Sequence, residues 1–130
     1  MRNGHMKAEK IYLNGAWVPP ASGLAIDVIS PSDGQVFARI AGGDGEDIDR
    51  AVKAARASLS GEWGRMAPAD RGRLLYKLSE LIKRDADELT NLEARDTGKP
   101  MSQARADIAA CARYFEFYAG AADKIHGETI

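Results

Sequence analysis

The sequence predicts an α/β fold built from two β-hairpins followed by about four helices. Before residue 44, runs of alternating apolar and polar residues are separated by turn residues, which is typical of strands with one covered face. From Asp44 onward the apolar residues recur about every 3.6 residues, the period of an amphipathic helix. No run of residues resembles a central sheet that these elements could cover, so they look like the outer layer of a larger fold.

The charge and cysteine content exclude several classes of partner and compartment. The chain carries 18 basic and 19 acidic residues, for a net charge of -1, and the two signs are interleaved. Phosphate binding needs a clustered positive surplus, so we expect no nucleic-acid partner. No apolar run approaches the roughly 18 residues of a membrane span, so we expect no membrane partner. The single cysteine, Cys111, rules out an internal disulfide and fits a reducing compartment, so we predict a cytoplasmic protein.

Residues 1–9 precede the first predicted element. They are polar and lack the apolar centre of a secretory signal. We therefore assign them to a disordered leader or a remnant of cloning, and we assign residues 10–130 to one structural region.

The first predicted hairpin covers residues 10–18. Its apolar residues flank Asn14 and Gly15, a pair that tolerates the positive φ angles of a type I′ turn. Pro19 ends the second strand because proline has no N–H to donate to a sheet.

The second predicted hairpin has strands at residues 25–30 and 35–40. The turn between them, residues 31–34, has Pro31 and Gly34 at its ends, as tight turns favour. Two such hairpins are marginally stable alone, so they need another surface to pack on.

The first predicted helix begins at Asp44 and is ended by Gly61. Glu46 and Asp47 place negative charge in its first turn, where the helix dipole favours it. Its apolar residues line one face: Ile48, Val52, Ala55 and Leu59.

The second predicted helix begins at Pro68, where the missing N–H costs little. The connector before it contains Trp63, which we expect to pack as an anchor. A stripe of large apolar residues is expected to be buried along this helix: Leu74, Leu75, Leu78, Leu81 and Ile82.

Two further helices are predicted towards the C-terminus. Residues 85–88 resemble a capping box with an acidic first member, so we expect a break there and a third helix to about Arg95. The fourth helix is expected from Ser102 to about Ala119. Its apolar positions include Ile108, Cys111, Ala112, Phe115 and Tyr118.

The pair Gly98-Lys99 is a candidate phosphate-binding element. A P-loop needs a glycine-rich stretch after a strand, with Ser or Thr following the lysine. Here a helix precedes the pair and Pro100 follows it. We therefore interpret Gly98 as the left-handed residue that ends the third helix, and we reject the phosphate cradle.

Cys111 is the only candidate thiol nucleophile in the sequence. A reactive thiolate needs an electropositive, partly exposed position with a base nearby, whereas Cys111 falls on the apolar stripe of the fourth helix. His5 lies in the leader and His126 lies 15 residues downstream. A buried structural thiol is therefore the favoured interpretation.

Asp96 lies at the end of the third helix, where the helix dipole opposes an acidic residue. One interpretation is that its carboxylate accepts hydrogen bonds from neighbouring backbone N–H groups, and this is favoured because Asp commonly does so in turns. The other is that it provides one oxygen of a hard-cation site.

Tyr114 and Tyr118 share one face of the fourth predicted helix. An aromatic stripe of this kind usually belongs to a core, which is the favoured interpretation. The alternative is that one edge of the stripe lines an apolar substrate tunnel.

Six segments together carry a family resemblance. In order they read YLNGAWV, SPSDGQV, GEDIDRAVKAARAS, EWGRMAPADRGRLLYKLSELI, LEARDTGKP and YFEFYAGAADKIHGETI. Their order and spacing resemble the start of NAD(P)-dependent aldehyde dehydrogenases, over about residues 10–130. The resemblance implies an N-terminal fragment of that fold, with residues 10–130 as the N-terminal part of the aldehyde dehydrogenase cofactor-binding domain. In this fragment two β-hairpins and about four helices flank a Rossmann-like cofactor domain that is mostly missing.

The resemblance implies a function for the full-length parent. Family members oxidise an aldehyde to a carboxylic acid with NAD or NADP, using a cysteine that forms a thioester and a glutamate that assists water. Both residues, and the cofactor-binding motifs, belong downstream of the matched segment. We therefore expect this chain alone to be inactive scaffold with no catalytic or cofactor-binding residue. The parent is expected to take a small aldehyde and to form a homodimer or homotetramer.

The resemblance also suggests a monovalent-cation site. In some members an aspartate that matches Asp96 joins backbone carbonyls that match those of Val28 and Ile29. This sequence departs from the family pattern there, because Ser30-Pro31 stands in place of Asn-Pro.

A second site suggested by the resemblance is the substrate tunnel. The fourth predicted helix resembles the helix that flanks the substrate entrance. Ala110 and Tyr114 are therefore candidates for the tunnel wall.

Two other functions stay open. The chain is then either a free-standing helical protein-binding module, which presents the aromatic face around Tyr114 and Phe117, or part of a semialdehyde dehydrogenase of the same superfamily. A free-standing module is expected to have few exposed apolar patches, whereas a fragment is expected to expose a large one. The semialdehyde dehydrogenase would act on an acidic substrate.

Overall fold

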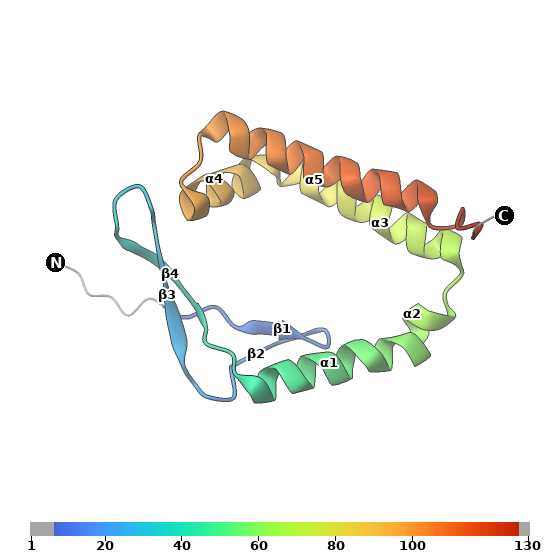
Figure 1. Cartoon of the computed structure of the whole chain (residues 1–130), viewed down its shortest axis with the longest axis horizontal. Helices are drawn as coiled ribbons and strands as arrows, with labels where there is room; N and C mark the ends of the chain where they lie inside the picture. The colour runs from blue at the N-terminus through green and yellow to red at the C-terminus, as the bar shows by residue number, and fades with distance from the viewer. Residues whose placement is uncertain (1–6, 128–130) are drawn as a thin grey trace. The chain divides into compact units, whose positions relative to one another are not determined.

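A computed structural model of the chain describes residues 7–127. It divides into two compact units, Met1–Gly64 and Arg65–Ile130. The first unit contains both hairpins and one long helix, and the second contains three helices (Figure 1). Most of the predicted leader lies outside the described residues. Within them, Glu9 already pairs with Ile40 in an isolated bridge, one residue before the predicted start.

The first hairpin consists of β1 (Ile11–Leu13) and β2 (Ala16–Val18), which pair antiparallel. Asn14 and Gly15 have φ angles of 50° and 81°, so the predicted type I′ turn is confirmed. Opposite each other on the strands, Tyr12 and Trp17 place their ring centroids 5.1 Å apart. Such a cross-strand aromatic pair stabilises a short hairpin.

The second hairpin consists of β3 (Ala25–Ile29) and β4 (Val36–Ala41), also antiparallel. Its turn is closed by a hydrogen bond of 2.9 Å from the Ser30 N–H to the Gln35 carbonyl. The register shifts between Val28 and Ile29, which marks a bulge. The predicted hairpin is confirmed, and the bulge is a feature that the sequence pattern did not reveal.

Helix α1 (Gly45–Ser60) begins in a capping box formed by Asp44 and Asp47. The Asp47 side chain is only 3% exposed, and it also accepts a hydrogen bond of 3.0 Å from the Ala21 N–H. One carboxylate therefore fixes the start of the helix and ties the loop after the first hairpin to it. The helix ends at Gly61, as predicted.

A single turn of helix, α2 (Glu62–Arg65), occupies part of the predicted connector. Trp63 lies in it and stays exposed, so the prediction that this side chain packs as an anchor is wrong. The helical turn itself was not predicted, because four residues are too few to carry a period of 3.6.

The second unit consists of α3 (Pro68–Arg84), α4 (Ala86–Thr97) and α5 (Met101–Ala121). Helix α5 runs alongside α3 and also contacts α4 (Figure 1). All three predicted helices are confirmed. Their predicted ends differ from the observed ones by one or two residues.

The break between α3 and α4 falls at Asp85, as predicted, but the capping box there is wrong. The Asp85 side chain makes no cap hydrogen bond. It instead forms an ion pair with Arg84, with an Nη2–Oδ2 distance of 2.7 Å. The Arg84 guanidinium beside it lowers the pKa of the Asp85 carboxyl.

Small residues form the contact between α3 and α5. Gly72 and Ser79 of α3 and Ala112 of α5 are buried, and the Ser79 hydroxyl donates a hydrogen bond of 2.8 Å to the Ala112 carbonyl. The buried stripe predicted for α3 is wrong at three positions, since Leu74 is 46% exposed and Leu78 and Leu81 are also exposed. Its other two members, Leu75 and Ile82, are half-buried. Small side chains let the two helices approach closely, while Leu74, Leu78 and Leu81 stay exposed.

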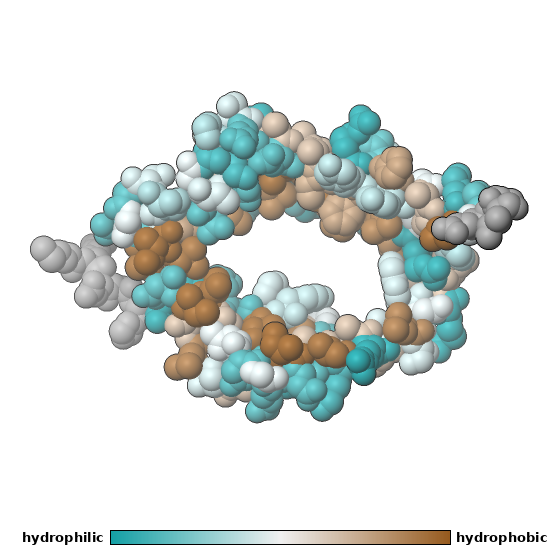
Figure 2. Space-filling model, viewed as in Figure 1, coloured by the Kyte–Doolittle hydropathy of each residue, from teal (hydrophilic) through white to brown (hydrophobic). Residues whose placement is uncertain are grey.

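Both units present uncovered apolar residues (Figure 2). In the first unit Ile48, Val52 and Leu59 lie exposed along α1. In the second unit Leu74, Leu78 and Leu81 lie exposed along α3. Within residues 7–127, none of the helices has the length and apolar character needed to cross a membrane.

Candidate functional site

The Gly98-Lys99 pair is a helix end. Gly98 has a φ of 74° and its N–H donates to the Ala94 carbonyl at 2.9 Å, which confirms the predicted left-handed cap. The Lys99 ammonium pairs with Glu93 and, at 2.8 Å, with Asp107. Hydrogen bonds to these carboxylates raise the pKa of Lys99, and the bond to Asp107 has the larger effect. A lysine held this way joins α4 to α5 and is not aimed at a phosphate.

Asp96 does not act as a turn acceptor. Among residues 7–127 no hydrogen bond or ion pair engages its carboxylate. The backbone N–H groups that follow it have other acceptors: Gly98 donates to the Ala94 carbonyl at 2.9 Å and Lys99 to the Thr97 hydroxyl at 3.5 Å. The favoured turn interpretation is therefore wrong, and Asp96 keeps a free carboxylate at the end of the helix.

The other predicted cation ligands lie in the first unit. Val28 and Ile29 are consecutive residues of β3 at the register shift, where β4 carries one extra residue, Phe37, between their partners Ala38 and Val36. Asp96 belongs to the second unit. The cation site therefore stays a prediction.

An apolar hollow of about 450 Å³ lies on α5, and it contains both predicted tunnel residues, Ala110 and Tyr114. We call it the aromatic hollow. Its lining residues are Ala110, Arg113, Tyr114, Phe117 and Tyr118. The favoured core interpretation of the aromatic stripe is wrong in this structure, since Tyr114 is 66% exposed and Tyr118 is also exposed.

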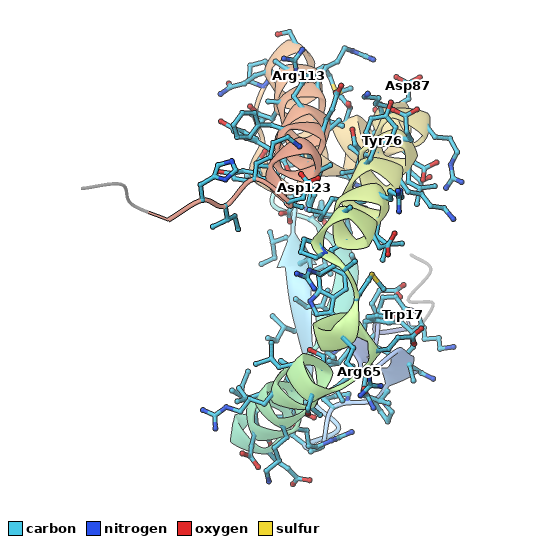
Figure 3. The ribbon with its side chains drawn as sticks, turned by 90° about the vertical axis from the view of Figure 1, so that its right-hand side faces the viewer. Trp17, Arg65, Tyr76, Asp87, Arg113 and Asp123 are labelled. Atoms are coloured by element: carbon cyan, nitrogen blue, oxygen red, sulfur yellow. The ribbon has the colours of Figure 1, made fainter. Side chains whose placement is uncertain are left out.

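The sequence analysis assigned no site role to Arg113, Phe117 or Tyr118 in this hollow. Their helical spacing from Ala110 was the available signal, because positions three and four residues apart share a face. Phe117 and Tyr118 meet edge to face, with centroids 5.2 Å apart and an interplanar angle of 87°. Arg113 is exposed on α5 (Figure 3).

Arg113 differs from its neighbours in having no polar partner. Among the described residues no acidic or carbonyl group pairs with its guanidinium. Earlier on the same helix, Arg105 forms an ion pair of 2.8 Å with Asp87. The aromatic hollow therefore combines apolar rings with one uncompensated positive charge.

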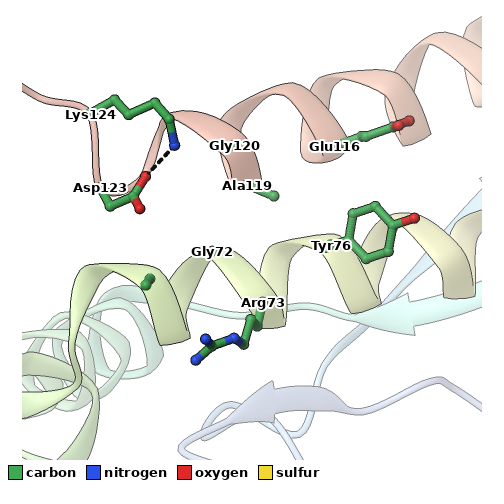
Figure 4. Close-up of a pocket in the computed structure, with 9 residues that line it drawn as sticks. Gly72, Arg73, Tyr76, Glu116, Ala119, Gly120, Asp123 and Lys124 are labelled. Carbon is green, nitrogen blue, oxygen red and sulfur yellow. Dashed lines mark hydrogen bonds and ion pairs between the residues drawn. The ribbon is translucent and has the colours of Figure 1, made fainter.

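A second hollow, of about 470 Å³, lies between α3 and the end of α5 (Figure 4). Its charges are already paired: Asp123 with Lys124 at 2.6 Å, and Glu116 with a lysine of α3 at 3.4 Å. The Lys124 ammonium lowers the pKa of Asp123. Arg73 pairs with the nearby Asp70. Paired charges of both signs give this hollow no preference for a ligand.

Cys111 lies near the middle of α5 and is a free thiol. It is half-buried, so the predicted full burial is only partly reached. The residues that share its face of the helix, three and four positions away, are Asp107, Ile108, Tyr114 and Phe115, and none of them offers a positive charge to stabilise a thiolate.

Two antiparallel hairpins and a packed helical unit define an α/β chain, and both units carry uncovered apolar residues. Comparison with known families makes this specific. The model of the aldehyde dehydrogenase family matches residues 17–130, and this chain belongs to that family.

Individual relatives agree over nearly the whole chain. Aldehyde dehydrogenase family 2 member C4 of Arabidopsis thaliana is 45% identical over 127 residues, which is 96% of this chain and 25% of the relative. The crystal structure of a Burkholderia cenocepacia protein assigned to the aldehyde dehydrogenases is 57% identical, with a TM-score of 0.90 over 93% of this chain and 26% of that one.

A third relative has been crystallised with its cofactor. A Staphylococcus aureus betaine aldehyde dehydrogenase, in complex with NAD+, is 35% identical with a TM-score of 0.88, over 95% of this chain and 25% of that one. The chain therefore spans about a quarter of the length of the relatives it matches.

Proposed function

We propose that this chain is the N-terminal scaffold of an NAD(P)-dependent aldehyde dehydrogenase, which we call the parent. The family match over residues 17–130 carries the proposal. Exposed apolar faces on α1 and α3 support it, because a free-standing binding module would be expected to cover such faces.

The parent's reaction is the oxidation of an aldehyde to a carboxylic acid, in which bound NAD or NADP accepts a hydride. No described residue of this chain suits the nucleophile or the cofactor site. Cys111 lacks the charge and the base that would activate it. The role of the chain is to support the parts of the parent that bind the nucleotide and form the thioester.

Two sites belong to this proposal. A monovalent cation would be held by the Asp96 carboxylate together with the carbonyls of Val28 and Ile29, and the lack of any other partner for Asp96 supports this role. Ala110 and Tyr114 would line the substrate entrance, which is supported by their position in one apolar hollow.

The compartment and the assembly of the parent are also proposals. We propose a cytoplasmic protein that forms a homodimer or homotetramer. The single cysteine supports a reducing compartment.

The test is turnover by the purified parent. With a small aldehyde and NAD or NADP, we expect carboxylic acid and reduced nucleotide in equal amounts. Failure to oxidise any of a panel of aliphatic and aromatic aldehydes, with either nucleotide and with the fold intact by circular dichroism, would contradict the proposal.

A further inference from the structure

We infer that Arg113 selects aldehydes that carry a carboxylate, while the aromatic hollow holds their apolar body. The inference rests on the proposed function, because it takes the hollow to lie at the substrate entrance. Of the functions that the sequence left open, the inference favours a semialdehyde dehydrogenase, which acts on an acidic substrate.

The first observation is the isolation of the Arg113 guanidinium. Among the arginines that the structure describes in the second unit, Arg113 is the one without an interaction inside the chain. The others have partners: Arg73 with Asp70, Arg84 with Asp85, Arg105 with Asp87, Arg71 with a carbonyl, and Arg65 and Arg95 with further groups.

The second observation is the surroundings of that charge. Tyr114 and Phe117 are exposed beside it and line the same hollow, with Ala110 leaving space between the larger side chains. Aromatic faces and edges accept a flat apolar group. The rings therefore offer an apolar surface for the body of a small molecule, and the Arg113 guanidinium in the same lining offers a charge for its polar end.

The chemistry of guanidinium identifies that polar end. Its planar fork of N–H donors matches the two oxygens of a carboxylate and forms paired, charge-assisted hydrogen bonds. A neutral aldehyde would leave Arg113 without a counter-charge, and a cationic aldehyde would be repelled by it. An aldehyde with a carboxylate at its far end satisfies both the rings and the charge.

The test compares two matched substrates in the parent. Para-carboxybenzaldehyde and para-methylbenzaldehyde differ in the carboxylate and share the aromatic ring. We expect Arg113→Gln to lower kcat/KM for the carboxylated substrate by about tenfold or more, chiefly through KM. For the methyl substrate we expect a change of less than about twofold.

Arg105→Gln is the control, since it makes the same change on the same helix at an arginine that already has a partner. It is expected to alter neither substrate. Equal losses of kcat/KM for both substrates in Arg113→Gln would indicate a structural role and overturn the inference. Unchanged kcat/KM values for both substrates would also overturn it.

A binding measurement separates this inference from the proposed function. Para-(hydroxymethyl)benzoate has the ring and the carboxylate but no aldehyde, so its binding by calorimetry does not depend on turnover. We expect the parent to bind it and Arg113→Gln to weaken that binding by about tenfold. Binding of equal strength in both proteins overturns the role of Arg113. Absence of turnover with every aldehyde contradicts the proposed function instead.

Discussion

At the scale of single residues, Gly72 controls how closely α3 and α5 approach. A Cβ built on this glycine would lie 2.5 Å from the Ala119 carbonyl oxygen, a backbone atom that cannot easily move. We expect Gly72→Ala to destabilise the protein by about 1–3 kcal/mol in urea unfolding, although alanine favours the helix.

Gly120→Ala is the matched control for this prediction. It lies on the partner helix, and nothing lies within 4 Å of its built Cβ. The substitution is expected to leave stability unchanged or to raise it by up to about 1 kcal/mol. Equal stability of the Gly72→Ala and Gly120→Ala proteins would show that the close contact is unimportant.

Cys111 gives a second prediction at this scale. The thiol is half-buried on α5, and the residues three and four positions away along the helix, Asp107, Ile108, Tyr114 and Phe115, bring no positive charge to it. Cys111→Ser should therefore leave the turnover of the parent nearly unchanged. Initial rates with saturating aldehyde and nucleotide provide the measurement. A variant that is folded by circular dichroism but inactive would assign this thiol a catalytic role.

Local chemistry decided which single residues could be predicted from the sequence. Gly98 and the Asn14-Gly15 turn were predicted correctly because positive φ angles demand particular residue types. The role of Asp96 was not, because the N–H groups that follow it found other acceptors, the Ala94 carbonyl for Gly98 and the Thr97 hydroxyl for Lys99. The missing partner of Arg113 could not be predicted either, since it depends on which acidic residues come near in the folded chain.

At the scale of secondary-structure elements, the start of α1 depends on Asp47. Its buried carboxylate accepts hydrogen bonds from the Ala21 and Asp44 N–H groups and pairs with Arg50. We expect Asp47→Ala to lower stability by about 1–2 kcal/mol, as loss of a capping interaction does. Thermal unfolding checks this. Glu46→Ala removes a similar charge from an exposed neighbour and should cost less.

The link between α4 and α5 predicts a dependence on pH. Because Asp107 and Glu93 raise the pKa of Lys99, the folded state holds that proton more tightly than the unfolded state does. The stabilisation is therefore fully present below the ordinary value of 10.5 and is lost as pH rises through the folded value. We expect Lys99→Met to lower the Tm at neutral pH.

The difference in Tm between wild type and Lys99→Met should shrink above pH 10.5. Lys77→Met serves as the control, since Lys77 is exposed on α3 and no described group pairs with it. A difference that stays constant across the alkaline range would mean that the lysine acts through packing and not through its charge.

Most elements were predictable because hydrophobic period and turn residues agree along the chain. The capping box at residues 85–88 failed because Arg84 competes for the Asp85 carboxylate. The leucine stripe of α3 failed for a different reason. Periodicity identifies an apolar face, but it does not reveal whether that face or the small-residue face meets the neighbouring helix.

At the scale of the whole molecule, the exposed apolar surface is the feature that a complete small domain would lack. Large side chains such as Ile48, Leu59 and Leu74 lie uncovered on helices of both units. The chain spans about a quarter of the length of the relatives it matches, and we propose that other parts of the parent cover these faces. Family motifs predicted the fold class correctly, whereas hydrophobic periodicity did not reveal which apolar faces stay uncovered in the folded chain.

The most direct test of the scaffold assignment is nucleotide reduction by the isolated 130-residue chain, measured beside the parent with the same aldehyde. We predict that the parent produces NADH or NADPH and that the chain alone produces none, at equal molar concentration. Steady aldehyde-dependent reduction by the isolated chain would contradict the account, because it would place the nucleophile and the nucleotide site within these residues.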